Sequence, residues 1–176
     1  MCNILLGWLG LVKVPSISVK LPRSIVERIE RDAKRAGLSL EEYIIELIFQ
    51  CLDLDERILE YVDVAKDLLE QAREELQKGD IRQAAEKVWG AAALTVKAYA
   101  EWRERRRLAS HGELWEYMRR MVKELGPWVR EVWMYANGMH TCFYEGWCGR
   151  EDVEEALERA KKLVIEVERK VKSTKS

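Results

Sequence analysis

The chain has 176 residues, of which 48% are apolar and 35% are charged. This length suits one domain, or a domain with a small module attached, and the apolar fraction excludes wholesale disorder. The 30 basic and 31 acidic residues nearly cancel, and two histidines are too few for a three-histidine zinc site within one chain.

The N-terminal segment MCNILLGWLGLV is apolar but too short to span a bilayer. It lacks the basic start and the cleavage site of a signal peptide, so we predict an apolar arm over residues 1–14. Four cysteines are too few for a secreted disulfide scaffold. A bend at Gly146 would nevertheless let Cys142 and Cys148 form a disulfide. We expect a soluble, cytoplasmic protein that does not associate with membranes.

A small module is predicted over residues 15–52. The segment PSISVKL, residues 15–21, alternates polar and apolar side chains, which indicates a half-buried strand. A helix then begins at Pro22 and ends at Gly37. The capping box S-L-E-E begins a second helix at Ser39.

This strand-helix-helix order, SISVKLPRSIVERIERDAKRAGLSLEEYIIELI, resembles the ribbon-helix-helix family. The resemblance implies a homodimer or higher homo-oligomer whose paired strands enter the DNA major groove, with Ser16, Ser18 and Lys20 facing the bases. A single strand also has no partner within its own chain. Glu41 and Glu42, however, stand where a DNA phosphate would approach, which weighs against DNA binding. The alternative is that these helices extend the rest of the fold.

The remaining chain is predicted to be an antiparallel helical bundle over residues 55–172, followed by a polar tail, 173–176. Its helices are recognised from apolar residues at helical spacing and from their caps. Their predicted ranges are about 55–79, 80–106, 110–126, 128–143 and 151–172. The predicted fold class is therefore mainly α, with a small strand-helix-helix module at the N-terminus.

Charge is distributed unevenly along the chain. Residues 13–36 carry a net charge of +4, residues 39–80 −9, residues 81–130 +5 and residues 131–176 −1. Such alternation serves ion pairing between helices, or it presents separate basic surfaces to an anionic partner. Pairing is the more common use.

Three motifs, LLEQAREELQKGDIRQAAEKVWGAAALTVKAYA, SHGELW and ANGMHTCFYEGW, follow one another in the order found in the PaREP family of archaeal proteins. The similarity covers roughly residues 55–170. It implies a HEPN-like bundle of four or five long helices, usually dimeric. Many HEPN proteins are RNA-cleaving toxins or nucleotide-associated modules.

HEPN nucleases use an arginine followed, after four to six residues, by a histidine. His140 lies in the matching segment, but the nearest preceding base is Arg130, so the motif is broken. Asn137 could donate a hydrogen bond there but has no charge. A literal match does link Arg106 to His111, at a boundary between two predicted helices. At that position His111 is most simply a solvated residue, with a ligand-binding role as the alternative.

The His140 ring is expected to point partly inward, because its helical neighbours on that face are apolar or aromatic. A buried histidine bonded to a neighbour is one interpretation, and a catalytic role supported by Tyr144 and Glu145 is the other. Lys87 and Lys97, on the alanine-rich helix, are candidates for lining a basic pocket. No cysteine pair with the spacing of a zinc site is present, so we predict neither a metal nor a cofactor.

The leading functional hypothesis is a dimeric, non-catalytic or degenerate module that binds nucleic acid or a nucleotide through residues 81–130. The first alternative is a metal-independent ribonuclease that uses His140. The second is a DNA-binding regulator that acts through the N-terminal ribbon.

Overall fold

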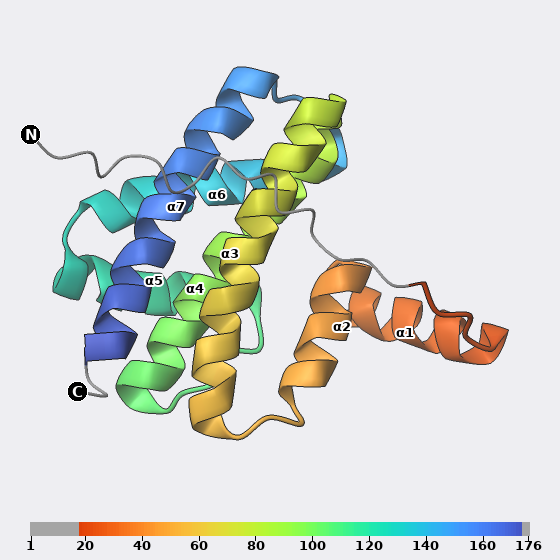
Figure 1. The fold of residues 1–176 in the computed structure, drawn as a ribbon, viewed down its shortest axis with the longest axis horizontal. Helices are drawn as coiled ribbons and strands as arrows, with labels where there is room; N and C mark the ends of the chain where they lie inside the picture. The colour runs from red at the N-terminus through yellow and green to blue at the C-terminus, as the bar shows by residue number, and fades with distance from the viewer. Residues whose placement is uncertain (1–17, 174–176) are drawn as a thin grey trace, which may run out of the picture.

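The structure is a computed structural model that describes residues 18–173, and all regular structure in that range is helical (Figure 1). The helices are α1 (Arg23–Ala36), α2 (Leu40–Phe49), α3 (Leu54–Lys78), α4 (Ile81–Glu104), α5 (His111–Leu125), α6 (Trp128–Glu145) and α7 (Arg150–Ser173). The predicted helices are thus confirmed, with small differences at their ends. None of these helices is long and apolar enough to cross a membrane.

Helix α4 is the centre of the bundle. From Ala84 to Glu101 every residue except Lys87 is buried. Helices α3, α5, α6 and α7 all pack against it, and Figure 1 shows α3 and α7 running along it. At Gly90 an added Cβ would lie 3.1 Å from Leu68 Cδ1, so the missing side chain permits the close approach of α3.

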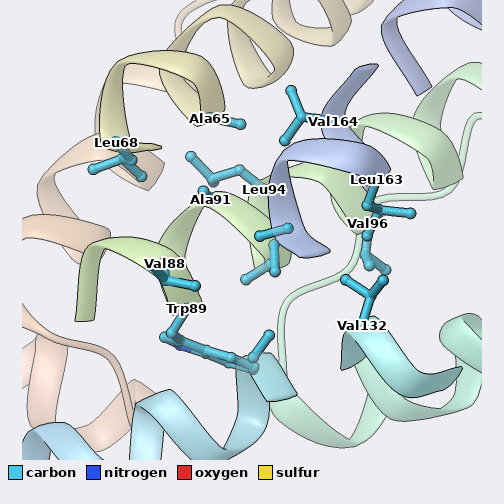
Figure 2. Packing of buried hydrophobic residues seen from close by; sticks show 14 of the residues in the cluster. Ala65, Leu68, Val88, Trp89, Ala91, Leu94, Val96, Val132, Leu163 and Val164 are labelled. Carbon is cyan, nitrogen blue, oxygen red and sulfur yellow. The ribbon is translucent and has the colours of Figure 1, made fainter. Parts of the chain in front are cut away.

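The core consists mainly of short apolar side chains from α3, α4, α6 and α7 around the fully buried Trp89 (Figure 2). Figure 2 shows Trp89 on α4 pointing toward α6, while Leu94 and Val164 approach from α4 and α7. Because α4 is almost completely covered, any polar side chain on it must find a partner inside the protein.

Local capping fixes where two of the helices begin. Ser39 and Ser110 each accept the backbone N–H three residues ahead, and Glu42 and Glu113 each accept the cap residue's own N–H. Both capping boxes satisfy backbone donors that a helix start leaves free. The box at Ser110 makes His111 the first residue of α5.

The predicted N-terminal strand is not seen in the part of the chain that the structure describes. Residues 18–22 have no regular structure, and residues 15–17 lie outside the described range. Val19 and Leu21, predicted to be half-buried, are exposed. A strand needs a partner for its backbone hydrogen bonds, and no second strand is present within residues 18–173. The two helices of the predicted module, α1 and α2, pack on each other beside the bundle.

The end of α6 is tied down by two independent links. Cys142 and Cys148 form a disulfide with Cα atoms 5.6 Å apart, across the left-handed turn at Gly146. Arg82, at the start of α4, donates hydrogen bonds to the carbonyl oxygens of Phe143 and Tyr144 at 2.7 and 3.1 Å. These links hold the last turn of α6, which follows directly after His140.

Candidate functional site

The chain's two histidines lie against each other. His111 begins α5 and His140 lies in the second half of α6, yet their ring centroids are 4.9 Å apart. The indole of Trp89 on α4 contacts both rings, at centroid distances of 5.0 Å to His111 and 4.8 Å to His140. Three different helices therefore form this cluster, and α4 contributes the indole that contacts both histidine rings.

Glu86, one turn before Trp89 on α4, places a carboxylate beside the histidines. Its Oε2 lies 3.7 Å from Nδ1 of His140, and the residue is only 6% exposed. Among residues 18–173, neither carboxylate oxygen has a hydrogen-bond partner, and the same holds for Nδ1 of His140 and Nε2 of His111. Buried polar atoms in proteins are nearly always hydrogen-bonded, so a buried carboxylate without a hydrogen bond, next to two histidines, marks a candidate functional site.

Tyr144 lies where the cluster meets the surface. Its ring contacts His140 edge-on at 5.2 Å, but the side chain is 55% exposed. Partial burial, followed by the charges of Glu86 and Glu42, raises the pKa of Tyr144. The hydroxyl therefore stays protonated at neutral pH and can donate a hydrogen bond.

The environment of His111 favours its neutral form. Burial is the largest cause that lowers the pKa of His111, and the neighbouring His140 and Lys97 lower it further. Glu86 acts in the opposite direction but does not reverse the shift. A neutral imidazole can accept a proton at neutral pH, which is the property required of a general base.

Helix α2 lies over this region through ion pairs. Lys97 of α4 donates to Glu46 at 2.7 Å, Arg107 also reaches Glu46 at 3.3 Å, and Lys87 pairs with Glu41. The two predicted pocket lysines are therefore both engaged by α2. The opposed charges of residues 39–80 and 81–130 meet here as pairs between helices.

Glu42 belongs to the same covering helix and carries an unfavourable charge. Burial raises the pKa of Glu42, and the charge of Glu86 raises it further, whereas hydrogen bonds from Ser39 and the charge of Lys97 lower it. The carboxyl groups of Glu42 and Glu86 therefore repel each other across the interface of α2 with the bundle.

Glu42→Gln is expected to stabilise the protein at about pH 7, and this gain should shrink toward pH 4. The ordinary pKa of this carboxyl is 4.5 and folding raises it, so the folded state loses stability as the pH rises above that value. Glutamine keeps the side-chain acceptor for the Ser39 N–H. Urea unfolding over a pH series measures the effect, with the exposed Glu60→Gln as the control. A gain that is equal at both ends of the series would contradict this account.

The other predicted site residues lie away from the histidine cluster or outside the described range. Arg130 is exposed and precedes His140 by ten residues on α6, or by about 15 Å along the axis. Asn137 is partly buried, and its carbonyl oxygen accepts a hydrogen bond from Thr141. The remaining residues are Glu145, Ser18 and Lys20, which are exposed, and Ser16, which lies outside residues 18–173.

Sequence reasoning missed Glu86 and misjudged the setting of His111. The signal for Glu86 is an acidic residue three positions before Trp89, on the alanine-rich helix α4. His111 was most simply a solvated residue, but it is partly buried against His140. Within residues 18–173 no three histidine, cysteine or acidic side chains are grouped so that they could hold a metal ion.

Comparison with known proteins confirms the resemblance to the PaREP family. The family model of the archaeal PaREP1/PaREP8 family matches residues 60–164, a range that begins within α3 and ends within α7. It contains both histidines, Glu86 and Trp89. No curated protein and no solved structure matches this chain. Since the matched range covers more than half of the sequence, the chain belongs to the archaeal PaREP1/PaREP8 family.

Proposed function

We propose that this protein binds RNA and cleaves it without a metal ion, with His111 and His140 as the acid–base pair. The observation that supports this most strongly is the meeting of the chain's only two histidines beside the buried carboxylate of Glu86, which lies 3.7 Å from His140. The arginine that the HEPN motif would place before His140 is missing. A second histidine from another helix supplies a proton-transfer group in its place.

In the proposed reaction His111 removes the proton from a ribose 2′-hydroxyl. The resulting 2′-oxygen attacks the adjacent phosphorus, and the bond from phosphorus to the 5′-oxygen breaks. His140 donates a proton to that leaving oxygen, so the products are a 2′,3′-cyclic phosphate and a free 5′-hydroxyl. Neutral His111 suits the role of base. Glu86 faces Nδ1 of His140 and would orient that ring, as a carboxylate does in catalytic triads.

RNA is the proposed substrate because this reaction uses the 2′-hydroxyl, which DNA lacks. Nearby, Tyr144 supplies a protonated hydroxyl at the edge of the cluster, where it can contact a phosphate or a base. Of the basic groups on α4, Lys97 lies near enough to His111 for its charge to lower the pKa of that ring.

His111→Ala and His140→Ala are each expected to slow RNA cleavage by about 10²–10⁴-fold, the range typical of a lost acid–base group. The assay uses untagged protein, a labelled single-stranded RNA and excess chelator, which should leave the rate unchanged. A matched RNA with one 2′-deoxy nucleotide should resist cleavage at that nucleotide. Arg130→Ala, on the same helix as His140, is the control and should retain activity. Equal cleavage by wild type and both histidine variants would refute the proposal.

A second candidate function is RNA or nucleotide binding without catalysis. It is favoured by the broken arginine–histidine motif, which leaves His140 without the arginine of the HEPN nucleases. If labelled RNA binds but neither wild type nor any variant cleaves it, this second function replaces the first.

We also propose that the chain forms a homodimer through α1 and α2. Ile25, Ile44, Leu47 and Ile48 on these helices are exposed apolar side chains, which a second copy would cover. Light scattering tests this assembly. DNA binding through Ser16, Ser18 and Lys20 stays a separate hypothesis, which a salt series on duplex DNA with Lys20→Ala would test.

A further inference from the structure

Helix α2 is attached to the bundle in two physically different ways. At its C-terminal end, Phe49 is fully buried and packs edge-on against Tyr61 of α3, with ring centroids 4.5 Å apart. In its first turn and in its middle, Glu41 and Glu46 form ion pairs with Lys87 and Lys97 of α4. An apolar anchor is insensitive to salt and to charged competitors, whereas an ion-paired contact responds to both.

The ion-paired contact covers cationic side chains that are unusually well buried. The side chain of Lys97 is only 8% exposed, and its partner Glu46 is 13% exposed. Lys87 is similarly shielded beneath Glu41, and Arg107 completes the row through its contact with Glu46. Two carboxylates, Glu41 and Glu46, thus neutralise three cations. The two glutamates are five residues apart on α2, which corresponds to about 7.5 Å along the helix axis.

The interface of α2 with the bundle also contains repulsion. Glu42 lies between the two paired glutamates in sequence and is partly buried, and its burial together with the charge of Glu86 raises the pKa of its carboxyl group. Two carboxyl groups in one buried region disfavour each other's charge. The contact of α2 with α4 is therefore attractive through Glu41 and Glu46 but opposed through Glu42, and an external anion could displace it.

We propose that α2 is a displaceable cover over an anion-binding face formed by Lys87, Lys97 and Arg107, and that phosphates of single-stranded RNA take the places of Glu41 and Glu46. This inference rests on the proposed function, because the uncovered face would lead RNA to the histidine cluster. Phosphate oxygens are the natural replacement for carboxylates opposite lysine and arginine. Phe49 would stay anchored while the turns of α2 that precede it move away from α4.

Opening of the cover is measured through the histidines themselves. Untagged protein has only His111 and His140, so their carbethoxylation by diethylpyrocarbonate reports access to the cluster. In the double variant Glu41→Gln/Glu46→Gln the rate is expected to rise several-fold above wild type. The control variant Glu60→Gln/Asp67→Asn changes net charge equally at exposed positions of α3 and should react like wild type. An unchanged rate in the Glu41→Gln/Glu46→Gln variant would overturn the proposal.

RNA binding tests the face beneath the cover. On a His140→Ala background, which prevents cleavage, polarisation of a labelled single-stranded RNA should show about tenfold tighter binding at low salt for Glu41→Gln/Glu46→Gln. Adding Lys87→Gln and Lys97→Gln should abolish that gain, and Glu60→Gln/Asp67→Asn should produce little gain. An equal gain in the control variant, or a gain that survives loss of both lysines, would overturn the proposal. Circular dichroism verifies that each variant is folded. If the double variant unfolds, the single variant Glu41→Gln replaces it in both measurements.

The two proposals can fail separately. If neutralising Glu41 and Glu46 opens the histidines and tightens RNA binding while no variant cleaves RNA, the cover stands and the acid–base function is refuted. If wild type cleaves RNA and the same charge changes alter neither histidine access nor binding, the cleavage stands and the cover is refuted.

Discussion

Replacing Arg57 by methionine is expected to lower the free energy of unfolding by about 3–5 kcal/mol, because it leaves a buried charge without its partner. That charge is on Glu101, near the end of α4, which is 1% exposed. Both carboxylate oxygens accept hydrogen bonds from Nε of Arg57, at 3.0 and 2.7 Å. Nη1 of Arg57 also donates to the carbonyl oxygen of Leu52 at 3.1 Å, so the same side chain fixes the joint between α2 and α3.

A double variant separates the buried charge from the lost packing. Arg57→Met with Glu101→Leu replaces the pair by apolar side chains of similar size and should recover most of the lost stability. Arg23→Met, which removes an exposed partner of Glu27, should change stability by less than about 0.5 kcal/mol. Urea unfolding followed by circular dichroism compares the variants. A small loss in the Arg57→Met single variant would show that Glu101 is protonated or finds another partner.

The helices could be predicted because their signals are local. Ser39 and Ser110 each begin a capping box, and apolar residues at helical spacing mark the buried faces between the caps. The prediction of a strand at residues 15–21 rested on the alternation of polar and apolar residues alone. A strand also needs a second strand for its backbone hydrogen bonds, and the sequence pattern does not show where that partner would come from. Its described part, residues 18–21, therefore remains without regular structure.

The site could be predicted only in part because its members meet through tertiary packing. His140 was identified from its motif and from its inward helical face, and its proximity to Tyr144 followed from i,i+4 spacing. His111 and Glu86 come from two other helices, and no sequence pattern gives the rotation of α4 against α5 and α6. The same holds for Lys87 and Lys97, whose partners on α2 depend on how α2 is placed over the bundle.

Replacing Trp89 by alanine is expected to lower the free energy of unfolding by about 3–5 kcal/mol and to disorder the histidine pair. Trp89 is fully buried, and its ring lies 5.3 Å from that of Trp133 as well as against both histidines. Alanine would leave a cavity at the point where α4, α5 and α6 meet. We expect RNA cleavage to fall by a similar factor to that in the histidine variants, because the rings would lose the surface that orients them.

Phenylalanine at this position distinguishes packing from orientation. The indole N–H of Trp89 has no hydrogen-bond partner in the structure, so Trp89→Phe removes an unsatisfied buried donor together with part of the ring. It should therefore cost less stability than alanine and keep an aromatic surface against both histidines. Trp102→Ala removes a partly buried tryptophan whose ring contacts Tyr99, and it provides the control for loss of an indole elsewhere on α4. Chemical unfolding and the RNA assay are measured on all three variants. If Trp89→Phe folds stably and cleaves RNA while Trp89→Ala does neither, the aromatic ring supports both the fold and the site. If Trp89→Ala retains full cleavage, the histidines do not depend on the ring at position 89.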